Sequence, residues 1–198
     1  MKIICIDFET ANHKSASACS VGLALLEKNR LSPIGHHFIK PHEENSYFHP
    51  NNIMIHGITP EDVLNSPEFD CVYNNYIKPY LGQVVFAAHN ASFDMSVLKD
   101  SLSLYNIECP DINYICSCRI SRRIWLLPSH KLSCVSEHLD FKFKHHNALE
   151  DALACGNIIK KAMEEKGFDS LDEFLESLKL PYSSLLHLGL KNNKVRSK

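Results

Sequence analysis

Length, composition and charge place the chain among globular proteins of one domain, or of one domain with a tail. It has 198 residues, of which 44% are hydrophobic and 22% charged, and this balance excludes an intrinsically disordered chain. The formal net charge of -2 argues against binding of duplex nucleic acid by bulk positive charge, but leaves open a site at which metal ions supply that charge.

The sequence shows no targeting or membrane segment. Only four apolar residues separate Lys2 from Asp7, which is too few for a secretory signal, and no apolar run approaches the length of a membrane span. The eight cysteines lie mostly in apolar segments without a C-x-x-C pair, so we expect buried thiols in a reducing cytoplasm. A zinc site at Cys116, Cys118 and His130 is an alternative, although its spacing fits no common zinc pattern.

The first predicted strand leads into two acidic residues. Residues 3–6 are apolar without interruption, which indicates a strand buried on both faces. Asp7 and Glu9 follow, and residues two apart point to the same side of a strand. Neighbouring carboxylates repel one another, more strongly when buried, so we expect a cation between them, with Mg²⁺ or Mn²⁺ as candidates. The alternative is a strand that ends in two ordinary surface acids.

The next segments predict a small antiparallel unit and then helices. Strands are expected at 21–26 and 35–40, and their short connections favour a three-stranded meander. A long polar loop is expected at 41–52. A Thr-Pro pair at 59–60 marks a helix start, and apolar residues at helical spacing predict an amphipathic helix over 69–80.

The second half alternates one more buried strand with helices. That strand covers 84–88, and the helix behind it places Asp94 in its first turn. Asn147 begins an N-x-x-E capping pattern for a long helix that carries Asp151 early and ends at Gly167. The remaining expected elements are an edge strand at 111–118, helices at 129–139 and 170–178, and a basic tail at 191–198.

Together these elements predict an α/β fold with a mixed central sheet of about five strands flanked by helices. Ligands of such sheets gather at the carboxyl ends of the strands. Asp7 and Glu9 lie at one such end, and Asp94 faces Asp7 if strand 84–88 is a parallel neighbour of the first. Asp151 would then complete four carboxylates from three segments, the ligand set of a two-metal site.

Three motifs carry a resemblance to a known family. They are Asp7-Phe8-Glu9-Thr10, His89-Asn90-Ala91-Ser92-Phe93-Asp94 and His146-Asn147-Ala148-Leu149-Glu150-Asp151. In order, spacing and context they resemble the motifs of the DEDDh exonucleases, and within them the DnaQ-like branch that holds the proofreading subunit of bacterial replicative DNA polymerase. The segment at 56–59 resembles a further stretch between the first two motifs. The resemblance covers residues 1–165 and implies an RNase H-like exonuclease domain, with a C-terminal helix and basic tail at 166–198.

The resemblance also implies an activity and roles for single residues. The activity would be metal-dependent 3′→5′ hydrolysis that releases nucleoside monophosphates. His146 would act as the general base, since an imidazole titrates near neutrality. Two Mg²⁺ or Mn²⁺ ions would be held by four carboxylates, those of Asp7, Glu9, Asp94 and Asp151. The candidates for substrate contact are Phe8, Thr10, His56, Asn90 and Phe93.

Some assignments stay open. His145 rivals His146, because a shift of one residue gives the same spacing to Glu150. We prefer His146, whose spacing ends on an aspartate. His89 and Asn90 have an alternative interpretation as a strand-to-helix turn.

The leading functional hypothesis is a DNA exonuclease that acts on single-stranded or frayed 3′ ends. Proofreading would require a DNA polymerase as a partner, since no polymerase segment is recognisable, and no membrane partner is expected. A 3′→5′ exoribonuclease that trims tRNA or short oligoribonucleotides is the alternative, because the same ions and histidine serve either polymer. A non-enzymatic interaction module is disfavoured, because all four acids are present.

Overall fold

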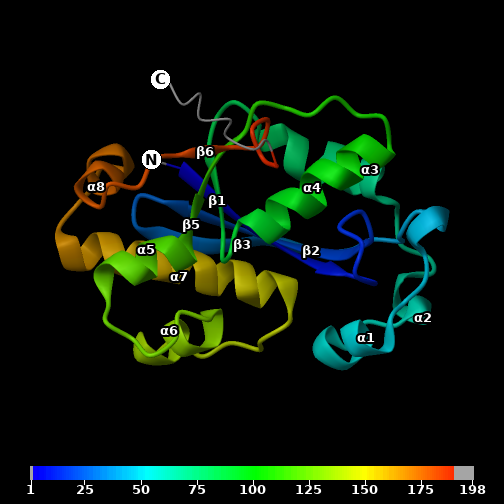
Figure 1. Ribbon diagram of the computed structural model, residues 1–198, viewed down its shortest axis with the longest axis horizontal. Coiled ribbons are helices and arrows are strands. Elements are labelled where there is room, and N and C mark those ends of the chain that lie inside the picture. Colours follow the sequence, from blue (N-terminus) through cyan, green and yellow to red (C-terminus); the bar gives the residue numbers. More distant parts are fainter. Residues whose placement is uncertain (1, 190–198) are drawn as a thin grey trace, which may run out of the picture.

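A computed structural model describes residues 2–189 and contains a six-stranded sheet with helices on both faces (Figure 1). The strand order is β3-β2-β1-β4-β5-β6. The strands are β1 (Lys2–Thr10), β2 (Ala18–Glu27), β3 (Arg30–Phe38), β4 (Val85–Ala88), β5 (Asn113–Cys116) and β6 (Ser183–Ser184). The α-helices are α1 (Pro50–His56), α2 (Pro60–Val63), α3 (Phe69–Val72), α4 (Ser92–Leu104), α5 (Ser117–Ile124), α6 (Leu132–His138), α7 (Ala148–Lys166) and α8 (Leu171–Ser177).

The sheet is mixed, as the sequence predicted. Strands β1, β2 and β3 form an antiparallel meander, whereas β4 pairs in parallel with both β1 and β5. The expected parallel neighbourhood of the first strand and strand 84–88 is therefore confirmed. Since β1 lies inside the sheet, its apolar residues are covered from both sides.

Alternate residues of β1 serve two separate cores. Ile4 and Phe8 pack with residues of α3 and α4, and Cys5 packs with residues of α7 and α8 on the other face. Figure 1 shows α4 and α7 on opposite sides of the sheet. Asp7 and Glu9 continue the odd-numbered series, so they belong to the α7 face of the strand.

Helix α7 lies unusually close to the sheet at its first turn. Gly22 of β2 pairs with Asp7 of β1, and a Cβ placed on Gly22 would lie 2.0 Å from the carbonyl carbon of Ala148. Only a residue without a side chain allows this approach. The contact brings the start of α7, which carries Asp151, next to the end of β1.

The helix boundaries with clear sequence signals are where they were expected. The Asn147 side chain accepts a hydrogen bond from the Glu150 N–H at 3.2 Å and begins α7. Gly167 ends that helix with a φ of 71°. The Ser170 hydroxyl oxygen caps α8 by accepting from the Glu173 N–H at 3.4 Å.

Two expectations in the first half were wrong. The third strand begins at Arg30 rather than near residue 35, because Lys28 and Asn29 form a tight turn with positive φ and the hairpin is longer than the apolar pattern suggested. The polar segment 41–52 is not all loop, since Pro50 begins α1 behind His49 as N-cap.

The expected helix over 69–80 is helical but changes its hydrogen-bond pattern. It runs from α3 into the π-helical segment η2 (Tyr73–Ile77) and the 3-10 turn η3 (Lys78–Tyr80). A further 3-10 turn, η1 (Glu43–Asn45), lies in the segment before α1.

The expected edge strand at 111–118 is also different. Strand β5 is flanked by β4 and by the two-residue β6, and the chain enters α5 at Ser117. Helix α6 is shorter than the expected 129–139. Helix α8 packs in the core that also holds α7 residues, and the domain division at residue 165 stays a prediction. The basic tail at 191–198 lies outside the described residues.

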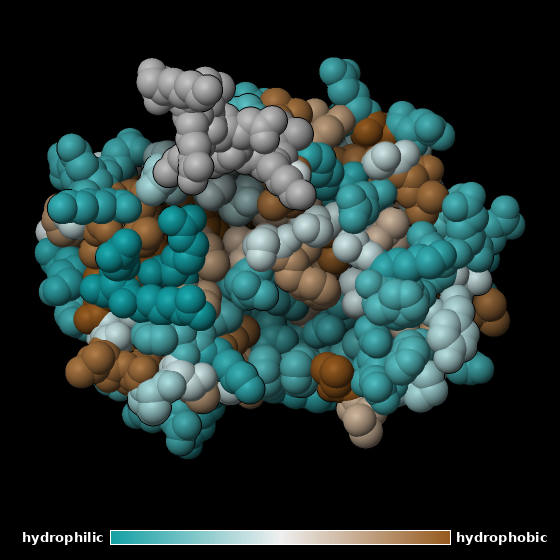
Figure 2. Space-filling model, viewed as in Figure 1, coloured by the Kyte–Doolittle hydropathy of each residue, from teal (hydrophilic) through white to brown (hydrophobic). Residues whose placement is uncertain are grey.

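Within residues 2–189, no helix is both long and apolar enough to cross a membrane. On the face seen in Figure 2, hydrophobic residues form scattered patches in a mainly hydrophilic surface.

Candidate active site

The predicted acids come together at the carboxyl end of β1. Each of Asp7, Glu9 and Asp151 offers a carboxylate oxygen, and these oxygens lie within 4.8 Å of one another. Asp7 and Glu9 come from one face of β1, and Asp151 from the first turn of α7 on that same face. The sequence prediction that these three residues meet is confirmed by this geometry.

Asp94 reaches the cluster from the other face of the sheet. It lies in the first turn of α4 with 1% of its surface exposed, and its Oδ1 accepts a hydrogen bond from the Phe8 N–H at 3.0 Å. Its negative charge raises the pKa of Asp7, after the larger effect of burial. Asp94 is thus beside the three clustered acids and fixed by the main chain between two of them.

Within the described residues, Asp7, Glu9 and Asp94 have no ion-pair partner, whereas Asp151 lies beside His145. Burial and the charges of Asp151 and Asp94 raise the pKa of Glu9 to about 8. Burial also raises the pKa of Asp94 to about 8, against the hydrogen bond from Phe8. Among residues 2–189, no lysine or arginine forms an ion pair with Asp7, Glu9 or Asp94. A set of buried carboxylates with raised pKa values and oxygen donors fits a hard divalent cation, which would restore their ionised forms.

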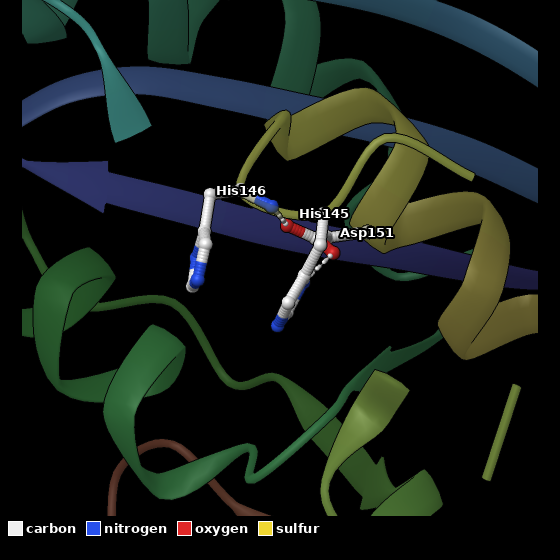
Figure 3. A group of neighbouring side chains, drawn as sticks. All are labelled: His145, His146 and Asp151. Atoms are coloured by element: carbon white, nitrogen blue, oxygen red, sulfur yellow. Dashed lines mark hydrogen bonds and ion pairs between the residues drawn. The ribbon is translucent and has the colours of Figure 1, made fainter. Parts of the chain in front are cut away.

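Two histidines, His145 and His146, lie just before the N-terminus of α7. The Nδ1 of His145 lies 2.8 Å from Oδ1 of Asp151, and the N–H of His146 donates to Oδ2 of the same residue at 2.8 Å. The two imidazole rings stack with centroids 3.9 Å apart and project in the same direction (Figure 3). Asp151 is therefore held by both residues, but through a ring in one case and through the main chain in the other.

The difference between the two histidines matters for their chemistry. His145 uses a ring nitrogen on Asp151, whereas the ring of His146 forms no hydrogen bond within residues 2–189. Burial, followed by the charge of His145, lowers the pKa of His146, which favours a neutral ring that can accept a proton. His146 also has a φ of 63°, an uncommon conformation for a residue with a side chain.

Two cavities meet at the acids. The larger, of about 780 Å³, contains the three clustered carboxylates and extends to the segment between α5 and α6. The smaller, of about 320 Å³, lies between the end of β1 and α1. Three residues line both cavities: Glu9, Phe93 and His146. The reacting groups would thus lie where the two cavities join.

The candidates for substrate contact fall into two groups. Phe93, with 45% of its surface exposed, and Thr10 line the smaller cavity, and Asn90 lines the larger one. Phe8 also borders the larger cavity, but only 2% of its surface is exposed, because its side chain packs in the hydrophobic core, and its N–H donates to Asp94. Both ring nitrogens of His56 are used within the chain, Nε2 on the Thr10 carbonyl at 3.2 Å and Nδ1 on a main-chain N–H.

The alternative zinc site receives no support. The metal-ligand groupings found within residues 2–189 contain neither Cys116 nor Cys118. Instead, the Cys118 thiol donates to the main-chain carbonyl of His130 at 3.4 Å, and the His130 ring bonds to Ser121.

Several residues that shape the site had no recognisable sequence signal. Gly22 was not singled out, because its role depends on a distant helix end. Asn52 donates to the Thr10 carbonyl at 2.8 Å from a segment expected to be a loop. Arg122 lines the larger cavity from α5, a helix that was not expected, and Lys131 lines it from the position directly before α6.

Comparison with known proteins agrees with the geometry. Residues 4–159 match the family model described as Exonuclease (RNase_T). The chain is 28% identical over 146 residues to a PolC-type DNA polymerase III of Bacillus cereus, of which it spans about a tenth (71% of this chain, 10% of that protein). It is 27% identical over 171 residues to exodeoxyribonuclease 10 of Escherichia coli K12, covering 82% of this chain and 69% of that protein.

A solved structure shares the architecture. The nuclease domain of 3′hExo, described as a DEDDh family member bound to rAMP, matches with a TM-score of 0.71 and 19% identity over 92% of this chain and 96% of that one. The expected RNase H-like fold is thereby confirmed. The chain belongs to the exonuclease family, and within it to the DnaQ-like 3′→5′ exonucleases of the DEDDh type.

Proposed function

We propose that this protein is a metal-dependent 3′→5′ exodeoxyribonuclease that removes nucleoside monophosphates from single-stranded or frayed DNA ends. The observation that carries the proposal is the group of Asp7, Glu9 and Asp151, whose oxygens lie within 4.8 Å of one another, with the His146 ring nearby. The family membership supplies the class of reaction. Exonucleases of this type work with divalent metal ions.

Two Mg²⁺ or Mn²⁺ ions would be held by Asp7, Glu9 and Asp151, with Asp94 acting through water. Such ions supply an activated water at neutral pH and positive charge beside the attacking and leaving oxygens. The three carboxylates favour these hard cations, and His145 and His146 form with Asp151 a second group of possible ligands beside them.

His146 would accept the proton of the attacking water. Among the residues that the structure describes, none hydrogen-bonds to its ring, and the ring borders both cavities, so it can reach a water at their junction. His145 would instead orient Asp151 through its ring, as a histidine or carboxylate behind a metal ligand commonly does.

The smaller cavity suits the terminal nucleoside. Thr10 and Phe93 offer a hydroxyl and an exposed aromatic face there, and a ring of that kind can stack on any base. His56 and Asn52 would act indirectly, by holding the main chain of Thr10 in place. Asn90 would approach the substrate from the larger cavity.

DNA is proposed as the substrate because exodeoxyribonuclease 10 covers most of this chain at 27% identity. RNA is the second candidate, since the 3′hExo domain with the same fold is described as bound to rAMP. Proofreading for a separate DNA polymerase is proposed only as a cellular role, on the similarity to a segment of PolC-type polymerases.

The test is hydrolysis of matched single-stranded DNA and RNA oligonucleotides, labelled on the 5′ end, with Mn²⁺ or Mg²⁺. The proposal expects stepwise shortening from the 3′ end, faster on DNA, and no shortening by the Asp7→Asn variant. Faster shortening of RNA would favour the exoribonuclease. Intact DNA and RNA with a folded, metal-loaded wild type would contradict both.

A further inference from the structure

The cavity that contains the acids is also lined by basic side chains from another part of the chain. Arg122 lies in the last turn of α5, and His130 and Lys131 precede α6. We refer to these three residues as the basic wall. No acidic residue of the segment 118–132 lines the cavity, and within residues 2–189 neither Arg122 nor Lys131 forms an ion pair.

Partly buried hydrogen bonds fix the basic wall to the sheet edge that carries the acids. His89, directly after β4, has its Nε2 2.9 Å from the His130 carbonyl and its Nδ1 2.8 Å from the Ser117 hydroxyl. Since a carbonyl can only accept, Nε2 of His89 donates, and in a neutral ring Nδ1 is then the acceptor that faces Ser117. Ser121 completes the network at 3.0 Å from Nδ1 of His130. Ser117 and Ser121 are fully buried, so the wall is a built part of the cavity.

The network also gives His89 a structural role that does not involve the metal site. Burial lowers the pKa of His89 to about 4, and the positive charge of nearby Arg122 contributes in the same direction. A neutral His89 keeps one donor and one acceptor, which is the pattern that the His130 carbonyl and Ser117 require. His89 is therefore a positioning residue for the wall rather than a ligand.

Unpaired cations beside a carboxylate cluster suit a polyanion that spans both. A nucleic acid strand carries one negative charge per nucleotide, so a strand with its scissile phosphate at the acids presents its next phosphate to the same cavity. We propose that Arg122 and Lys131 form a second phosphate subsite, which binds the phosphodiester on the 5′ side of the scissile bond. This inference rests on the proposed function.

The proposed seat of the terminal nucleoside gives the direction of the strand. That seat is the smaller cavity of about 320 Å³, where Thr10 and Phe93 lie. The rest of the strand then continues through the larger cavity of about 780 Å³, past the basic wall. The arginine fork suits the phosphate oxygens, and the lysine adds a point charge.

The test compares a dinucleotide, which has only the scissile phosphodiester, with a pentanucleotide that extends to the subsite. For Arg122→Ala and Lys131→Ala we expect KM for the pentanucleotide to rise about tenfold, with KM for the dinucleotide and kcat for both unchanged. The slope of log Kd for the pentanucleotide against log salt should fall in magnitude by about 0.7 per lost contact. Arg123→Ala and Lys142→Ala are matched controls, because both residues are exposed and neither lines the cavity.

A binding measurement separates the phosphate subsite from the proposed function. Fluorescence anisotropy would monitor binding of the labelled pentanucleotide to the His146→Gln variant in the presence of Mg²⁺. If the wild type hydrolyses both substrates but Arg122→Ala and Lys131→Ala behave like the controls, or weaken both lengths equally, the subsite is wrong. If the wild type hydrolyses neither substrate, the proposed function is wrong. In that case anisotropy still tests the subsite. Weaker pentanucleotide binding after the loss of Arg122 or Lys131 would support it, and unchanged binding would contradict it.

Discussion

Replacing Gly22 with alanine should disable the site although none of the acids or histidines in it is substituted. An alanine Cβ at this position would lie 2.0 Å from the carbonyl carbon and 2.1 Å from the oxygen of Ala148. Ordinary contact begins at 3.4 Å, so the first turn of α7 must move away from β2 by about 1.4 Å. The clash is with main chain, which cannot rotate away as a side chain can. Because Asp151 lies in that turn, it would move away from Asp7.

The size of the effect follows from this displacement. Overpacking of a well-packed core costs about 1–3 kcal/mol, which lowers the melting temperature by roughly 2–12 °C in a chain of this length. A misplacement of about 1 Å in an active site costs on the order of 10²-fold in rate. We therefore expect a folded Gly22→Ala protein with weakened Mn²⁺ binding and a kcat about 100-fold lower.

Thermal melts, Mn²⁺ titration and single-strand hydrolysis test this prediction together. The control is Gly156→Ala, a substitution in the same helix, α7. A Cβ at Gly156 would meet only the ends of two side chains, those of Leu31 at 2.5 Å and Cys5 at 3.1 Å. It should lose stability but keep most of its Mn²⁺ affinity. Wild-type stability and activity in Gly22→Ala would refute the argument that this contact sets the position of α7.

Three further predictions concern the residues around the acids. His146→Gln should lower kcat by roughly 10²–10⁴-fold with unchanged Mn²⁺ affinity, whereas His145→Ala should weaken Mn²⁺ binding by about 10–100-fold; calorimetry and initial rates distinguish them, and the reverse pattern would exchange their roles. The pKa values of Glu9 and Asp94, raised to about 8 from ordinary values of 4.5 and 3.8, mean that the folded metal-free protein holds these protons more tightly than the unfolded chain does. Its free energy of unfolding should therefore fall as the pH rises from about 5 to 8. Denaturant titrations in EDTA should show that this free energy depends less on pH in the Glu9→Gln variant. A free energy of unfolding that rises with pH in this window through the Glu9 titration would contradict the burial argument. Asn147→Ala removes the hydrogen bond that begins α7 and should cost about 1 kcal/mol in urea unfolding, and an unchanged unfolding midpoint would show that the cap contributes nothing.

The sequence was most informative where chemistry and local structure coincide. Asp7 and Glu9 follow an apolar strand, and period-two geometry alone places them on one face. Asn147 and Gly167 mark the ends of α7 by capping rules that depend only on neighbouring residues. The meeting of Asp151 with the first two acids was predictable because the motifs indicated a common fold.

Other features depend on contacts between distant segments. Strand β6 has only two residues, and its pairing with β5 follows from the path of the chain after α8 rather than from any strand signal. Helix α5 has only eight residues, and its buried face carries Ser117 and Ser121 beside Ile120, so few apolar residues mark it in the sequence. The bond from the Phe8 N–H to Asp94 joins residues 86 apart and could not be inferred from either motif.

The central claim is that the carboxylate cluster binds metal ions. Its most direct test is a calorimetric titration of the metal-free protein with Mn²⁺ near pH 7, in buffers of different ionisation enthalpy. The account predicts two bound ions per chain with release of protons, because the buried carboxylates must ionise to bind them. Asp7→Asn and Asp151→Asn should lose at least one ion. Absence of binding to the folded wild type, or unchanged binding by these variants, would contradict the metal site from which the function is derived.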